Sequence, residues 1–179
     1  MCINAKKSQL MILFPPANKS DLTLDLADCK IKHQEQIKVL GVTLSSNMKF
    51  EDHIWKGDNN MCKRINTKIA LLKTVKPFIS EKALGEIAAN LVNSTLLYAA
   101  PLWGSSVNSN IDKLQSTQTK AARVVNNKAW KRQKKKSHRQ ELLNQLNWPN
   151  TKQIIHMATA NITKKAIMGK SSVGMDKMF

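Results

Sequence analysis

The sequence is poor in aromatic residues and in cysteine. Phe, Trp and Tyr make up 5% of the 179 residues, so few large side chains are available to anchor a core. The three cysteines, Cys2, Cys29 and Cys62, include no C-x-x-C pair, and such a sparse, odd set does not suggest a disulfide framework. The lack of disulfides favours a reducing intracellular compartment, either nuclear or cytoplasmic.

Long hydrophobic runs are also missing from the sequence. No window approaches the roughly 18 apolar residues that a membrane helix needs. The run MILFPP ends at Pro15 and Pro16 and is too short for the apolar region of a secretory signal peptide. We therefore expect neither a secretory signal nor a membrane partner.

Acidic residues are scarce beside the basic ones. Lys and Arg total 29 and Asp and Glu total 12, which gives a formal net charge of +17. The excess is concentrated in residues 91–179, which hold 15 basic and 3 acidic side chains. Each phosphate that a protein neutralises releases condensed counterions, so such an excess favours a polyanionic partner. The pattern predicts a nucleic-acid surface, mostly in the second half of the chain.

Short apolar or alternating runs fill the first part of the sequence. They predict strands over residues 8–14, 22–26, 29–33 and 36–45, and hence a small, mostly antiparallel sheet. Gly41 interrupts the last of these runs, which is typical of a bulge or of a close backbone approach.

From Phe50 onward the apolar residues follow a helical period instead. The first apolar stripe is Ile54, Met61, Ile65, Ile69 and Leu72, the second is Leu84, Ile87, Ala88, Leu91, Val92 and Leu96, and the third is Ile111, Leu114, Gln118, Ala121, Ala122 and Val125. The sequence thus predicts an α+β chain, with a small antiparallel sheet followed by a bundle of four or five helices.

Several residues predict where these helices begin and end. Pro77 ends the first helix, and Ser80 is a typical N-cap for the second. Asn110 is a candidate cap for the third helix and Ser137 for a short helix that runs through Leu146. The last helix is expected over residues 153–168.

A strongly basic segment, KAWKRQKKKSHR, covers residues 128–139. Its side chains are suited to contact phosphates, and its tryptophan is suited to stack on a base or ribose. A solvated loop or a nuclear-localisation signal would have a similar composition. The charge excess of the whole chain favours nucleic acid, and the candidate contacts are Lys128, Trp130, Lys131, Arg132, Lys134, Lys135, Lys136 and Arg139.

The residues by themselves give little sign of catalysis or of metal binding. Cys29 and His33 have no second tight pair of ligands, which argues against structural zinc. Asp21, Asp25 and Asp28 flank an expected strand and are more typical of charges that protect a sheet edge. No phosphate-binding Walker loop, G-x-S-x-G or H-E-x-x-H occurs. We therefore expect this chain alone not to be an enzyme and to need no cofactor.

Four stretches of the sequence, taken in order, resemble a known family. They are INAKKSQLMIL at 3–13, IKVLGVTLSSNMKFEDHI at 37–54, LLYAAPLWGS at 96–105 and IDKLQSTQTKAARVV at 111–125. Together they resemble the C-terminal part of a non-LTR (LINE-like, jockey-type) retrotransposon reverse transcriptase. The resemblance extends over about residues 3–168.

The resemblance implies a division of the chain. Residues 1–49 would be the end of the palm with primer-grip-like strands, and residues 50–127 would be thumb-like helices. Residues 128–139 would be a basic linker, and residues 140–179 a C-terminal helical segment with a frayed tail. Gly41 would let the backbone of the primer grip approach a nucleic-acid strand.

The resemblance also assigns roles to single residues. Lys7 matches the family's lysine that is a candidate proton donor to leaving pyrophosphate. Lys120 and Arg123 match the basic positions of the family's L-x-x-x-Q-x-K-A-x-R pattern, and thumb residues of this kind hold a template–primer duplex by its backbone.

The sequence departs from the family pattern at several positions. Ser8 stands where threonine is usual, Val39 where an aromatic residue is common, and Ala99 where glycine is frequent. The larger departure is that no A-D-D occurs, so the aspartates that hold Mg²⁺ in the full-length family enzyme are missing. Lys7 would then remain from an active site whose catalytic aspartates are missing from this sequence.

Three interpretations follow from the resemblance. The chain is a polymerase-derived remnant that binds RNA–DNA hybrid or duplex without sequence preference. Alternatively, it is a truncated or degenerate retroelement product with no independent function. The third interpretation is part of an active reverse transcriptase, which requires a reading frame that extends upstream to an A-D-D segment.

Overall fold

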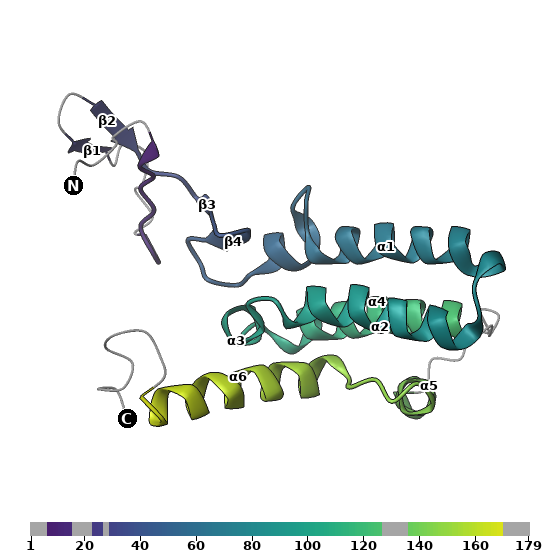
Figure 1. Ribbon diagram of the computed structural model, residues 1–179. Helices are drawn as coiled ribbons and strands as arrows, with labels where there is room; N and C mark the ends of the chain where they lie inside the picture. The colour runs from purple at the N-terminus through teal and green to yellow at the C-terminus, as the bar shows by residue number, and fades with distance from the viewer. Residues whose placement is uncertain (1–6, 16–22, 27–28, 127–135, 170–179) are drawn as a thin grey trace.

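The computed structural model in Figure 1 has a strand-rich N-terminal part followed by a larger helical part. It describes residues 7–15, 23–26, 29–126 and 136–169. The predicted α+β class, with a small antiparallel sheet component followed by helices, is therefore confirmed.

The strands form two separate antiparallel pairs instead of one sheet. β1 (Thr23–Leu26) pairs with β2 (Cys29–Lys32), and β3 (Gln36–Val39) pairs with β4 (Val42–Ser45). None of the residues of β1, β2 and β3 is fully buried, whereas Val42 of β4 is 4% exposed and joins the hydrophobic core. β4 is thus the strand that connects the two parts of the chain.

The prediction of a strand over residues 8–14 is wrong. Within this segment, Leu10 forms an isolated parallel bridge with His33, and Phe14 N donates a hydrogen bond to Ser46 O over 2.9 Å. These are single attachment points and not a continuous ladder. Apolar residues in a short run gave the strand signal, but no strand in the part of the chain that the structure describes forms a ladder with this segment.

The run over residues 36–45 is a hairpin, and Gly41, where a bulge or a close backbone approach was expected, lies in its turn. Leu40 and Gly41 have φ angles of +48° and +82°. Two consecutive positive φ angles are typical of the tight turns that join antiparallel strands. Glycine adopts this conformation at little cost, so Gly41 reverses the chain between β3 and β4.

The helical part begins with the short π-helical turn η2 (Asp52–Lys56), and six α-helices follow among the described residues. Their bounds are α1 (Met61–Val75), α2 (Glu81–Leu97), α3 (Ala100–Trp103), α4 (Asn108–Val125), α5 (Lys136–Gln145) and α6 (Thr151–Ile167), with a 3-10 turn η3 (Lys76–Phe78) after α1. Within the described ranges, no helix has the length and apolar character needed to cross a bilayer.

Some of the predicted helix boundaries are confirmed and others are wrong. Ser80 caps α2 by accepting a hydrogen bond from Ala83 N, as predicted. Asn110 is not a cap, because α4 begins at Asn108. Ser137 lies inside α5, which begins at the preceding residue. The last helix is capped by Asn150 in a capping box, a device that the spacing of apolar residues does not reveal.

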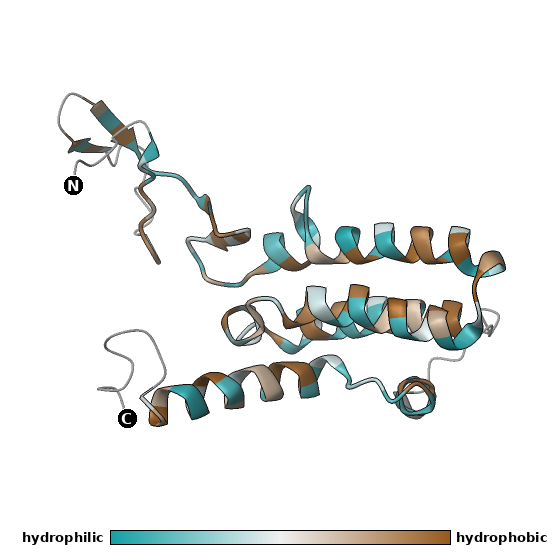
Figure 2. Cartoon of the chain, in the orientation of Figure 1, coloured by the Kyte–Doolittle hydropathy of each residue, from teal (hydrophilic) through white to brown (hydrophobic). Residues whose placement is uncertain are grey.

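The helices pack in layers around one core. α1 lies on one side of α2 and α4, and α6 lies on the other (Figure 1). Hydrophobic and hydrophilic segments recur along α1 and α6 (Figure 2), as the helical period predicts. All five residues of the first stripe are buried, but Ile87 of the second is 41% exposed. The buried row of α2 instead has a spacing of four residues: Leu84, Ala88, Val92 and Leu96.

The corner over residues 98–106 is a packing feature. Trp103 is fully buried, and its Nε1 donates a hydrogen bond to Tyr98 O over 2.9 Å. A Cβ on Gly104 would lie 2.5 Å from Ala100 O and from a side-chain carbon of Ile155, so only glycine allows this approach of α3 to α6. Ala99 has a φ of +51°, a left-handed conformation that favours glycine.

Candidate nucleic-acid interface

A cleft lined by polar and cationic side chains lies between η2, α1, α4 and α5. It has a volume of about 600 Å³ and is open to solvent. We call it the basic cleft, and the residues that give it its character are Trp55, Asn66, Lys113, Ser116, Lys120 and Arg139. Asp112 is the one carboxylate among its lining residues, so cations outnumber acids in the cleft.

The spacing of polar residues along α4 explains one wall of the cleft. Ser109, Lys113, Ser116 and Lys120 are separated by four, three and four positions, which places them on one face of a helix. The buried residues of α4 occupy the opposite side and pack into the core. Burial of the apolar stripe therefore turns the two lysines outward, where both are exposed.

Trp55 is held in place by a buried amide. Its Nε1 donates to Asn110 Oδ1 over 2.9 Å, and Asn110 is 1% exposed. Asn110 Nδ2 in turn donates to Lys49 O over 3.2 Å and to Ser106 Oγ over 2.7 Å. These bonds connect η2, α4 and the segment before η2, and they fix the position of the indole ring. The Asn110 side chain therefore stabilises this junction and does not cap a helix.

Two lysines lie near the face of that ring. Lys113 Nζ is 2.8 Å from the ring centroid, and Lys56 Nζ is 5.1 Å from it. Both distances are within the range of cation–π attraction. Lys56 also forms a salt bridge with Glu51 and does not line the cleft. Lys113 is therefore the lysine that both contacts the ring and lines the cleft.

The floor of the cleft is neutral. Thr117 Oγ1 donates a hydrogen bond to Cys62 Sγ over 3.6 Å, and burial raises the pKa of the Cys62 thiol. The thiol therefore stays protonated and packs against the core. In the described residues, no group of three His, Cys, Asp or Glu side chains is placed to hold a metal ion.

Arg123 and Arg139 extend the positive surface from α4 to α5. Both are half-buried. Burial, and to a lesser extent the charge of Arg139, lowers the pKa of Arg123. Guanidinium groups remain protonated through such shifts, so the two arginines repel each other.

The structure brings together only part of the predicted interface. Lys120 and Arg139 line the basic cleft, and Arg123 interacts electrostatically with Arg139. Lys7 is exposed and Gly41 lies in the β3–β4 turn near the Tyr98 ring, and neither lines the cleft. Lys136 is the first residue of α5. The other predicted contacts lie outside the described residues: Lys128, Trp130, Lys131, Arg132, Lys134 and Lys135.

The sequence prediction missed several residues of the basic cleft, and it missed Asn110, which holds Trp55: the missed cleft residues include Trp55, Asn66, Lys113 and Ser116. Lys113 had a usable signal, because its spacing of seven from Lys120 places both on one helix face. Trp55 and Asn110 had none, because they are 55 residues apart and only the tertiary fold brings their side chains together.

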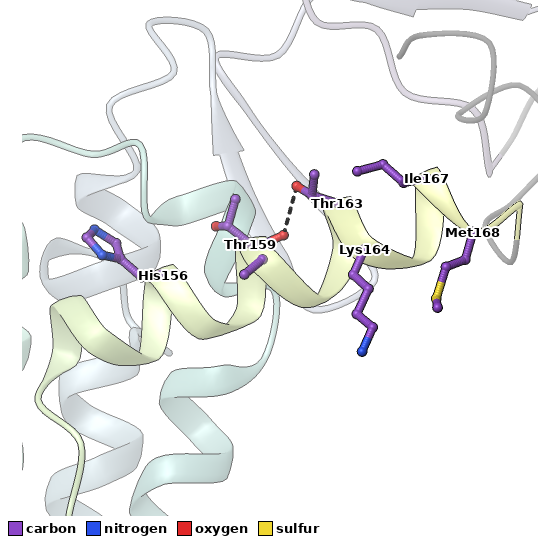
Figure 3. Close-up of a pocket in the computed structure, with 7 residues that line it drawn as sticks. His156, Thr159, Thr163, Lys164, Ile167 and Met168 are labelled. Carbon is purple, nitrogen blue, oxygen red and sulfur yellow. Dashed lines mark hydrogen bonds between the residues drawn. The ribbon is translucent and has the colours of Figure 1, made fainter.

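Other hollows of the molecule are less suited to phosphate. One runs along the C-terminal turns of α6 (Figure 3), where Ile167 and Met168 give it an apolar character and Thr163 Oγ1 is bonded to Thr159 O. Another, near the start of α2, carries the carboxylates of Glu81 and Glu86. The basic cleft is therefore the best candidate for an anionic ligand.

Comparisons of this chain with protein-family models, with curated proteins and with solved structures found no match.

Proposed function

We propose that this chain binds nucleic acid through its phosphate backbone and without sequence preference. The partner is RNA–DNA hybrid or duplex, as for a thumb-like part of a non-LTR retrotransposon reverse transcriptase, and the setting is nuclear or cytoplasmic. The observation that carries the proposal is the basic cleft, where Lys113, Lys120 and Arg139 converge beside a fixed tryptophan. Cationic side chains that converge on one surface are the electrostatic footprint of phosphate binding.

The proposal includes no catalysis by this chain alone. Phosphoryl transfer by the two-metal mechanism needs closely placed carboxylates, and the family's A-D-D does not occur in this sequence. Lys7, the family-matched proton donor, has no role in the proposed activity. Mg²⁺ belongs to the full-length family enzyme in this scheme, and backbone binding needs no cofactor.

The test is a titration of the full chain against a fluorescently labelled RNA–DNA duplex at several salt concentrations, followed by anisotropy. We expect the logarithm of the association constant to fall linearly with the logarithm of the salt concentration. Replacing Lys113, Lys120 and Arg139 by glutamine should make the slope shallower by about 2 to 3, since each lost phosphate contact removes about 0.9.

A matched control carries the same loss of charge elsewhere. Lys152, Lys164 and Lys165 are exposed on α6, and their replacement by glutamine should change the slope much less. Equal effects of the two triple variants would mean that overall charge, and not the basic cleft, governs binding. Lack of binding at low salt by the folded chain would refute the proposed function.

A further inference from the structure

The basic cleft has the dimensions of a small-ligand site and not those of a duplex groove. Its volume of about 600 Å³ falls among the sites that hold single small ligands. A duplex can lay its phosphates across the rim of such a cleft but cannot enter it. A single unpaired nucleotide can enter, because its base and phosphate are free to turn away from the strand.

The cleft offers a partner to each part of a nucleotide. The half-buried ring of Trp55 provides a surface on which a base can stack, and Asn110 keeps the ring from turning. Lys113, Lys120 and Arg139 provide charge for a phosphate. Stacking on an aromatic ring tolerates every base, in agreement with binding that has no sequence preference.

Lys113 links the two parts of the site. In the free protein its ammonium group lies over the Trp55 ring. A base that stacks on this face displaces Lys113, which then becomes available to the phosphate of the same nucleotide. The exchange is favourable, because base stacking on an aromatic ring is generally stronger than a solvent-exposed cation–π contact, and a cation–phosphate contact is gained.

We propose that the basic cleft is a seat for one unpaired nucleotide of a single-stranded segment, with the base on Trp55 and the phosphate between Lys113, Lys120 and Arg139. This inference rests on the proposed function and deepens it. The chain would then prefer a duplex that carries a single-stranded extension over a duplex with paired ends.

The test compares two labelled RNA–DNA duplexes with the full chain by anisotropy. One carries a short single-stranded extension, and the other carries an abasic extension with the same number of phosphates. We expect the extension with bases to bind about tenfold more tightly, the gain typical of one stacked base. Trp55→Leu should bring the ratio of the two affinities close to one, because it removes the ring on which the base stacks.

A second pair of variants covers the case in which Trp55→Leu does not fold. Ser109→Glu places a carboxylate in the cleft, and Asn108→Glu places the same charge on the neighbouring residue, which does not line it. Both residues are exposed in the first turn of α4, where an acid is favourable to the helix. Ser109→Glu should bring the ratio of the affinities for the two extended duplexes close to one. Asn108→Glu should leave this ratio at its wild-type value.

The outcomes separate the two proposals. Equal binding of the two extended duplexes by the wild-type chain would refute the proposed nucleotide-binding site. It would not affect the proposed function. A ratio that neither Trp55→Leu nor Ser109→Glu changes would place the preference outside the cleft and overturn the inference. Failure to bind either duplex at low salt would overturn the proposed function itself, and the inference with it.

Discussion

The helical part and the strand-rich part of this chain differ in what holds them together. Among the described residues, every core residue lies at Val42 or beyond, and the β1–β2 pair has no fully buried side chain. A two-stranded pair with no buried face is marginally stable by itself, whereas amphipathic helices gain their stability from burying one face. The comparison indicates that the core of the helices forms without any side chain of β1–β2.

The β3–β4 hairpin lies between these two extremes. Val42 packs into the core, and the hydroxyl of Tyr98 donates a hydrogen bond to Leu40 O in the turn. The imidazole of His53 accepts a hydrogen bond at Nδ1 from Thr43 N over 3.3 Å. Leu44 of β4 also packs against the core. The hairpin is thus attached to the helices by both apolar and polar contacts, and the polar ones can be changed by mutation or by pH.

Matched leucine truncations should give the largest difference between the two parts. Leu114 on α4 is fully buried and Leu24 on β1 is 48% exposed. Leu114→Ala should lower the free energy of unfolding by about 2 to 5 kcal/mol, since it removes buried carbon and leaves a cavity. Leu24→Ala should lower it by less than about 0.5 kcal/mol. Urea unfolding followed by circular dichroism measures both, and similar losses would contradict the comparison.

Acid should weaken the junction between the hairpin and the helices. His53 is 2% exposed, and burial, followed by the charges of Arg64 and Lys38, lowers its pKa from 6.5 to about 4. The folded protein therefore binds this proton less tightly than the unfolded chain, so stability is full above the unfolded pKa and falls as the pH drops toward the folded one. When the pH is lowered from 7.5 to 5, the protonation of His53 should lower the free energy of unfolding by about 2 kcal/mol.

The contribution of His53 is isolated by comparing variants. His53→Asn keeps a hydrogen-bond acceptor for Thr43 N but cannot titrate, and it should lose less stability on acidification than the wild-type chain. His156 is exposed on α6, so His156→Asn should lose as much as the wild-type chain. Urea unfolding at both pH values provides the measurement. An unchanged acid loss in His53→Asn would mean that the junction is not the acid-sensitive point.

A smaller effect should distinguish the corner before α3 from a regular helix. Ala99 has a positive φ, so Ala99→Gly should raise the free energy of unfolding by about 1 kcal/mol. Ala70 is exposed inside α1, and Ala70→Gly should lower it by about 0.5 to 1 kcal/mol. Thermal or urea unfolding of the two variants should therefore give changes of opposite sign. A loss of stability in Ala99→Gly would show that the corner is not strained.

The helical stripes were the most predictable feature of the fold. Met61, Ile65, Ile69 and Leu72 of α1 are all buried, because a period of three to four residues by itself defines one face of a helix. Ile54 is also buried, but it lies in the separate turn η2. The strands were less predictable. The apolar run at 8–14 reads as a strand, but a strand needs a partner, and the sequence does not say which backbone is available.

The candidate interface was predictable only in part, for the same reason. The positive charge of the second half and the spacing of Lys113 and Lys120 are properties of the sequence. The meeting of these lysines with Trp55 and Arg139 is not, because the four residues come from η2, α4 and α5. Side chains from separate helices converge only after packing has fixed how the helices lie against one another.

The sequence by itself determined most of the buried stripes of the helices, with Ile87 as an exception, and it determined the large positive charge of the chain. Both follow from the order and kind of neighbouring side chains. Only the tertiary structure decided that Asn110 is a buried partner of Trp55 and not a helix cap, and that Gly41 turns a hairpin instead of marking a bulge. The physical reason is that local period and charge are set within a few residues. A hydrogen bond or a cleft depends on contacts between segments far apart in the chain.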